Sequence, residues 1–137
     1  WERPMKNLQA GELFLNFTGA HTAAQEITRT LTDQEIKFAF TSYTSGGLYT
    51  SYAFRQDAIY LYLEKEMIDQ FRENFGTKRE GNVRATIYAP DRDVFANAQE
   101  KESIRITSPA QTLLDLAGLG YSALDMTTVM VEKYAGL

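Results

Sequence analysis

The stretch Ala58-Ile59-Tyr60-Leu61-Tyr62-Leu63 decides how this chain folds. Every position in it is apolar or aromatic, although successive side chains of a strand point to opposite faces of a sheet. A strand with such residues on both faces is normally covered on both sides. We therefore predict a strand over residues 58–63 that lies in the centre of a β-sheet.

A helix and a second strand follow this segment. Four apolar side chains recur at helical spacing before Gly76, a residue type that commonly ends helices; they are Met67, Ile68, Phe71 and Phe75. Residues 82–88 then alternate, with Val83, Ala85 and Ile87 on one face. Strand, helix and strand between residues 58 and 88 predict a right-handed crossover that joins two parallel strands.

Before this unit, the pattern predicts a strand at 12–16, a helix that starts near Thr18-Gly19, and a strand at 36–41. The buried stripe of the helix is Ala20, Ala23, Ala24, Ile27 and Leu31. A short helix is expected between residues 42 and 54, starting in or near Gly46-Gly47. Residues 1–11 show no period and contain Pro4 and Gly11, so we predict a connector there.

After this unit, residues 90–101 are expected to be irregular and residues 104–107 to form a short strand. Ser108-Pro109-Ala110-Gln111 carries a hydroxyl N-cap, a proline at the first helical position and a glutamine to close a capping box. Ser122-Ala123-Leu124-Asp125 repeats the capping-box pattern for a last helix. Residues 12–137 thus predict a single α/β domain, with a small mixed sheet of about four or five strands flanked by helices.

Composition excludes several classes of protein. The chain is 44% hydrophobic and 12% aromatic, which is typical of a globular core. It has no cysteine, so disulfides, thiolate metal sites and a cysteine nucleophile are excluded. No apolar run approaches the roughly 18 residues that a membrane span needs, and no signal-peptide pattern is present. We expect a cytoplasmic protein with no membrane contact.

The charge pattern argues against DNA binding by these residues themselves. The formal net charge is -4, and the 14 Lys and Arg residues are scattered along the sequence. DNA-binding domains usually cluster basic residues on one face, because phosphate contacts supply most of their affinity. Since the chain begins at Trp1 and not at methionine, we take it to be a fragment that lacks an upstream domain.

Candidate catalytic residues are few. His21 is the sole histidine, which excludes sites with two histidines, and Asp91-Arg92-Asp93 mixes charges of both signs in a loop. Gly46-Gly47 followed by Arg55 and Asp57 resembles the first half of a nucleotidyltransferase motif, in which a glycine turn cradles phosphate and paired carboxylates hold Mg²⁺.

The second half of that motif is missing. The second acidic position is occupied by Ile59, and residues 82–88 contain no acid. We therefore predict that the chain is not an enzyme, with no catalytic residue, no metal and no cofactor. The alternative is a degenerate nucleotidyltransferase-like domain that still binds a nucleotide at Gly46-Gly47.

Aromatic residues are concentrated around the central strand, and residues 43–62 contain only one Arg and no Lys among them. This favours core packing or a protein interface over stacking on bases. The predicted partner-binding residues are Tyr43, Tyr49, Tyr52, Arg55 and Asp57. A further alternative is a structural dimerisation module, with a symmetric apolar patch on the last helix and a homodimer as its product.

Three stretches occur in an order that resembles a known family. The first is Phe38-Ala39-Phe40-Thr41 before an aromatic-rich helix. The second is residues 58–63, followed after a helix by Gly81-Asn82-Val83. The third is Asp91-x-Asp-Val94-Phe95 and then Ile106-Thr107-Ser108-Pro109-x-Gln-Thr-Leu-Leu114-Asp115-Leu116. Over roughly residues 33–134, this order resembles the C-terminal domain of AbiEi-family antitoxins from type IV toxin–antitoxin, or abortive-infection, systems.

The resemblance implies a regulatory function. In that family an N-terminal winged helix-turn-helix binds the operon promoter, and the C-terminal domain is associated with neutralising a nucleotidyltransferase toxin. It implies a non-catalytic antitoxin and transcriptional regulator in phage defence, with a protein partner and with DNA bound only through the missing N-terminal domain. The sequence departs from the family where Ser42 replaces a glycine and Gly46-Gly47 replaces alanines.

Overall fold

The computed structural model describes residues 8–51, 57–76 and 81–134. These residues form six strands in one sheet, in the order β1-β4-β3-β2-β6-β5. The strands are β1 Gln9–Leu15, β2 Phe38–Phe40, β3 Ala58–Leu63, β4 Val83–Tyr88, β5 Gln99–Lys101 and β6 Ile104–Ile106. The α-helices are α1 Ala20–Asp33, α2 Tyr43–Thr50, α3 Ile68–Phe75, α4 Pro109–Ala117 and α5 Leu124–Lys133, with short 3₁₀ turns at Lys65–Met67 and Gly120–Ala123.

Strand β3 lies inside the sheet and is buried along its whole length, as its two apolar faces predict. It runs parallel to β4, so the predicted parallel pair joined through α3 is confirmed. On its other side it is antiparallel to β2, which in turn runs parallel to β6. Strand β1 is antiparallel to β4. The sheet is therefore mixed, and the predicted α/β fold class is confirmed, with six strands in place of the expected four or five.

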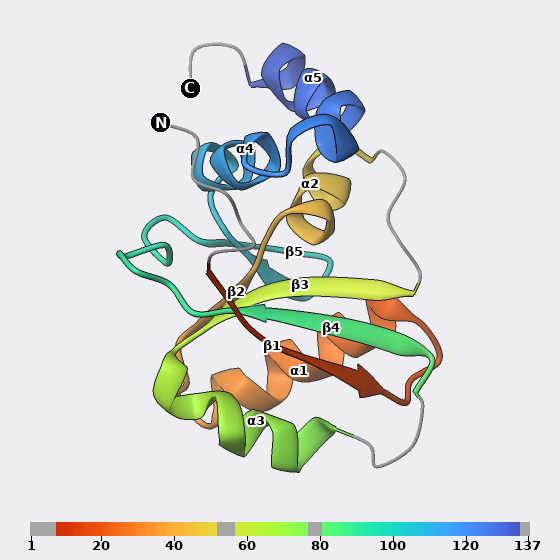
Figure 1. The fold of residues 1–137 in the computed structure, drawn as a ribbon, viewed down its shortest axis with the longest axis vertical. Coiled ribbons are helices and arrows are strands. Elements are labelled where there is room, and N and C mark those ends of the chain that lie inside the picture. Colours follow the sequence, from red (N-terminus) through yellow and green to blue (C-terminus); the bar gives the residue numbers. More distant parts are fainter. Residues whose placement is uncertain (1–7, 52–56, 77–80, 135–137) are drawn as a thin grey trace.

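Helices cover the sheet in two groups (Figure 1). Helices α1 and α3 lie together on one side, and the predicted stripe of α1 is buried there at all five positions. The second group consists of α2, α4 and α5, which pack on one another away from α1 and α3. The first residues after β2 and β6 lead directly into α2 and α4. Any site built where these strands end is consequently framed by the second helix group.

The face of the sheet opposite α1 carries a layer of tyrosines. Alternate residues of β3 point to this face, and Tyr60 and Tyr62 lie next to Tyr88 of β4 in a second buried cluster with Ala58 and Val94. The rings of Tyr62 and Tyr88 are 6.0 Å apart between centroids. Strand β3 thus packs into two separate hydrophobic clusters, one through its aliphatic face and the other through its aromatic face.

Four local predictions need correction. Strand β1 begins at Gln9, inside the predicted connector. Strand β5 falls in the region predicted to be irregular. Helix α2 begins at Tyr43, ahead of the glycines. Helix α5 begins at Leu124 after a 3₁₀ turn, which places Ala123 at its N-cap in place of the predicted Ser122.

No helix in the described ranges is long and apolar enough to cross a membrane.

Candidate functional site

Three of the predicted partner residues lie within the described ranges, and they differ in burial. Tyr49 is only 1% exposed, and its hydroxyl donates to the Thr107 carbonyl at 2.6 Å, so this residue belongs to the core. Tyr43 is half-buried, with its ring centroid 5.5 Å from that of Tyr60. Asp57 is exposed just before β3. The predictions for Tyr52 and Arg55 lie outside the described residues.

Gly46 is a packing position and not a phosphate cradle. Its amide already donates to the Ser42 carbonyl at 2.8 Å within α2. A Cβ atom at this position would lie 2.5 Å from the Sδ atom of Met126 and 3.1 Å from Leu116. Glycine therefore lets α2 approach α4 and α5 closely. The Gly46 amide is therefore not free in the way that the nucleotide-binding alternative expects.

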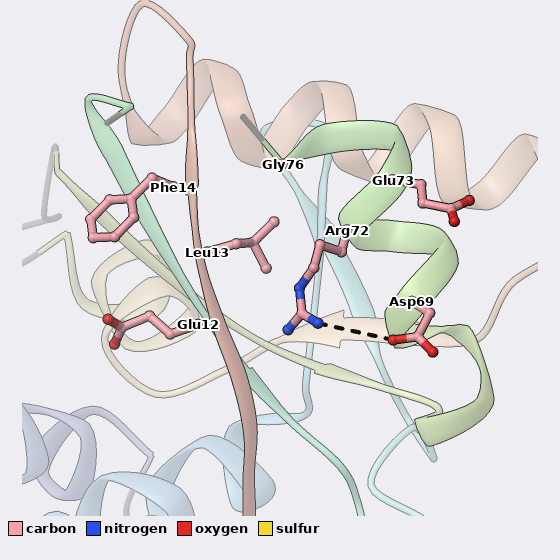
Figure 2. Close-up of a pocket in the computed structure, with 7 residues that line it drawn as sticks. All are labelled: Glu12, Leu13, Phe14, Asp69, Arg72, Glu73 and Gly76. Atoms are coloured by element: carbon pink, nitrogen blue, oxygen red, sulfur yellow. Dashed lines mark ion pairs between the residues drawn. The ribbon is translucent and has the colours of Figure 1, made fainter. Parts of the chain in front are cut away.

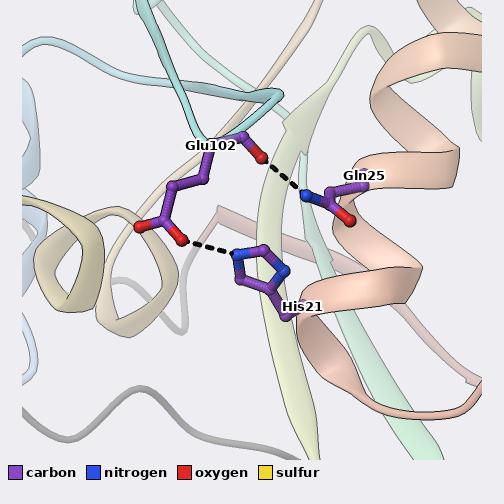
Figure 3. A network of polar contacts seen from close by, with 3 residues as sticks. All are labelled: His21, Gln25 and Glu102. Carbon is purple, nitrogen blue, oxygen red and sulfur yellow. Dashed lines mark hydrogen bonds and ion pairs between the residues drawn. The ribbon is translucent and has the colours of Figure 1, made fainter.

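His21 joins α1 to the turn between β5 and β6 (Figure 3). Its Nε2 atom lies 3.0 Å from the Oε1 atom of Glu102, and Gln25 one turn later donates to the Glu102 carbonyl at 2.8 Å. Glu102 has a positive φ of 51°, a backbone conformation that such outside contacts help to hold. The histidine thus fixes a turn at the surface.

The acidic loop after β4 has a structural contact as well. The Oδ1 atom of Asp93 accepts the Phe95 amide at 2.9 Å, an arrangement that closes a turn through the side chain. Within the described ranges, no group of three or more His, Cys, Asp or Glu side chains converges in a way that could hold a metal ion.

The main polar feature of the interior is Asp115 of α4, which sequence reasoning missed. Its side chain is 4% exposed and accepts three hydrogen bonds. Thr41 donates from the end of β2 at 2.5 Å, Tyr62 donates from β3 at 2.8 Å, and Gln111 donates from one turn earlier in α4 at 2.9 Å. The side-chain amide of Gln111 therefore binds the Asp115 carboxylate and does not close the predicted capping box. Only the other half of that box forms, in which the Ser108 hydroxyl accepts a hydrogen bond from the backbone amide of Gln111.

Hydroxyl groups extend this network between the two strand ends. The hydroxyl of Thr112 lies 2.8 Å from that of Thr107 and 2.8 Å from that of Ser45. Thr107 donates in turn to Thr41 at 3.3 Å. All four residues are buried. The network thus ties α2 and α4 to the ends of the parallel strands β2 and β6.

Burial sets the acid–base properties of the network. It raises the pKa of Asp115 above its usual value, while the hydrogen bonds from Thr41, Tyr62 and Gln111 act in the opposite direction. Burial and the neighbouring Asp115 charge raise the pKa of Tyr62. The phenol therefore remains a hydrogen-bond donor at any physiological pH.

Ser42 lies beside this network in a strained conformation. It connects β2 to α2 with φ 61° and ψ −129°, values that favour glycine. Its side chain is 0% exposed, and its hydroxyl has no hydrogen-bond partner among the described residues. This is the position at which the resemblance in the sequence predicts glycine.

The Asp115 network can hold helices α2 and α4 in place, but its polar groups are not accessible to a substrate. A general base must reach the proton that it removes, whereas Asp115 is enclosed and its oxygens are already engaged. A signal for this residue exists in the sequence, because Gln111 and Asp115 are spaced by one helical turn. Its partners Thr41 and Tyr62 lie 74 and 53 positions away, so the spacing alone does not identify the network.

The described surface carries four large apolar side chains that are substantially exposed: Phe14, Leu114, Leu124 and Val131. Leu124 and Val131 are 52% and 49% exposed and lie seven residues apart on α5, which places them on the same face of the helix. Thr128 lies between them, and its hydroxyl is engaged with the Leu124 carbonyl at 2.9 Å. We refer to Leu124, Thr128 and Val131 as the α5 face.

Comparison with known proteins gives no match, either to a family model, to a curated protein or to a solved structure.

Proposed function

We propose that this chain is a non-catalytic regulatory domain of a cytoplasmic type IV toxin–antitoxin system that acts through protein contacts. The observation that carries the proposal is the contrast between the interior and the surface. The buried carboxylate of Asp115 has all its donors within the fold, while apolar side chains are exposed on a helix. We take the exposed apolar side chains on this helix as the surface that contacts another protein.

The α5 face is the surface that we assign to this contact. Leu124 and Val131 are presented by a helix whose opposite side, with Met126 and Met130, is buried in the core. The helix is therefore anchored by its buried side, and a partner that binds its exposed side gains apolar burial. The antitoxin assignment itself rests on the sequence resemblance, with the toxin being a nucleotidyltransferase and DNA bound by an N-terminal winged helix.

The proposal is tested by co-expressing the chain with the protein encoded beside it. Growth rescue and co-purification are measured for the unaltered chain and for Leu124→Asp combined with Val131→Asp. Thr22→Asp combined with Thr32→Asp is the matched control, because it adds the same two carboxylates at exposed positions of α1.

Rescue by the unaltered chain and the control, but not by the α5 variant, is the expected result. A neighbour that is not toxic, or rescue that persists without this chain, would overturn the antitoxin proposal. Equal rescue by all three forms would overturn the assignment of the α5 face.

A further inference from the structure

The α5 face has the spacing of one side of a two-helix interface. Leu124, Thr128 and Val131 are separated by four and three residues, the spacing at which side chains form the seam between two packed helices. All three residues are exposed. The Thr128 hydroxyl is bonded to the Leu124 carbonyl, so the polar group in the middle of the seam is satisfied within α5. The exposed seam therefore has the geometry to pack against a second helix.

Two carboxylates lie along one flank of the α5 face. Asp125 follows Leu124 by one position and Glu132 follows Val131 by one position, so helix geometry turns both by roughly 100° in the same direction. Both residues are exposed, and their separation of two helical turns places them on the same side of α5. We call Asp125 and Glu132 the acidic flank.

The described residues do not neutralise the acidic flank. Neither Asp125 nor Glu132 makes a hydrogen bond or an ion pair with another side chain in the described ranges. Lys133 is the only basic residue of α5, and its ammonium group donates to the Tyr49 carbonyl near the end of α2. The two carboxylates are thus available to cationic groups from outside the chain.

A second copy of this chain is a poor occupant of the α5 face. In an antiparallel pair of α5 helices, the two acidic flanks would lie opposite each other, and like charges in that position oppose pairing. In a parallel pair, the acidic flank would face the other flank of the copy, which within α5 is Thr127. That residue is uncharged, and its hydroxyl is bonded to the Ala123 carbonyl. A basic helix supplies the counter-charge that a second copy lacks.

We propose that an amphipathic helix of a partner protein packs along the α5 face and places lysine or arginine side chains opposite Asp125 and Glu132. The apolar residues of this helix bury Leu124 and Val131, and its basic flank determines the choice of partner. Since α5 has 10 residues, the contact extends over about three turns of each helix. This inference rests on the proposed function, because it specifies the partner of the same face.

The test uses the whole chain, labelled with ¹⁵N, and two synthetic peptides of about 18 residues, above the length at which isolated helices are marginal in water. Both peptides carry a leucine stripe with the spacing of the α5 face, flanked by lysine in one peptide and by glutamate in the other. Amide chemical shifts are recorded during titration. The lysine peptide is expected to shift the amides of α5 and to bind about tenfold more tightly than the glutamate peptide at low salt. Added salt should reduce this difference.

Charge reversal tests whether the acidic flank causes this preference. Asp125→Lys combined with Glu132→Lys should reverse it, so that the glutamate peptide binds more tightly than the lysine peptide. The matched control is Asp69→Lys combined with Glu73→Lys, which makes the same change in net charge at exposed positions of α3 (Figure 2), in the other helix group. The ion pair of Asp69 with Arg72 that this control removes is 3.9 Å long and exposed, so it contributes little to stability. The control should bind both peptides as the unaltered chain does.

Three results would overturn the inference. One is the absence of shifts in α5 with the lysine peptide at its highest soluble concentration. Another is equal binding of the two peptides to the unaltered chain. The third is a loss of preference in the α3 control as large as that in the α5 variant, which would indicate attraction to the net charge of the chain. The proposed function fails separately in the rescue experiment, because a neighbour that is not toxic removes the antitoxin assignment without changing how the two peptides bind.

Discussion

Replacing Ser42 with glycine should stabilise this domain. The residue has φ 61° and ψ −129°, and a side chain that must adopt this conformation costs about 1–3 kcal/mol. Its buried hydroxyl has no partner among the described residues, which adds about 1 kcal/mol or more. Glycine gives back roughly 0.4–1 kcal/mol because it increases the entropy of the unfolded chain.

The net gain expected for Ser42→Gly is therefore about 1–3.5 kcal/mol in the free energy of unfolding. For a domain of this size, such a gain corresponds to a rise of roughly 3–12 °C in Tm. No capping interaction is lost, because the Ser42 side chain makes no hydrogen bond to the start of α2. The carbonyl that accepts the Gly46 amide is part of the backbone and is retained.

Urea unfolding of three proteins separates the two contributions. Ser42→Ala removes the hydroxyl but keeps a Cβ atom at positive φ, so its gain should be smaller than that of Ser42→Gly. The difference between the two variants measures the backbone strain. The reasoning would be refuted if Ser42→Gly were no more stable than the unaltered chain. It would also be refuted if Ser42→Ala were as stable as Ser42→Gly.

Three further predictions concern the packing around α2 and α4. Asp115→Asn should lower the free energy of unfolding by about 2–3 kcal/mol in urea titrations, because its amide group cannot accept all three hydrogen bonds; a loss below the error of the titration would contradict this. Burial raises the pKa of Asp115 in the folded state, so the folded chain holds the Asp115 proton more tightly than the unfolded chain does. Protonation of Asp115 therefore stabilises the fold. This stabilisation is present below about pH 4 and is lost as the pH rises through the raised pKa. The advantage of the unaltered chain over Asp115→Asn should thus be larger at pH 4 than at pH 8, and a difference that is constant or grows with pH would oppose it. Gly46→Ala should lower the free energy of unfolding by about 1–2 kcal/mol, despite the better helix propensity of alanine, because its Cβ atom would clash with Met126. A double-mutant cycle with Met126→Ala should show a coupling of at least about 0.5 kcal/mol. Additive changes in stability would show that the clash is not with Met126.

The parts of the fold that were predicted correctly have strong local patterns. Residues 58–63 are apolar on both faces, and α1 has five apolar residues at helical spacing. These patterns determine burial within a single element, so no knowledge of distant residues is needed. Strand β5 had no such signal, because Gln99, Glu100 and Lys101 are polar and pair with β6 through their backbone.

The candidate site was less predictable for a different reason. Asp115 meets Thr41 and Tyr62 only because β2, β3 and α4 are neighbours in the folded chain. Tyr49 was assigned to a surface because tyrosine is common at interfaces, yet its hydroxyl finds a carbonyl acceptor inside the core. Side chains that combine an apolar body with a polar group suit either environment, and their position in three dimensions decides between the two.

The pairing of β1 with β4 has a consequence for synthesis of the chain. Residues 9–15 leave the ribosome well before their partner strand β4, which ends at Tyr88. Until then, the apolar side of β1, with Leu13 and Leu15, has no sheet to join. Because such long-range pairing also slows folding, nascent chains that stop before β4 should be the aggregation-prone species.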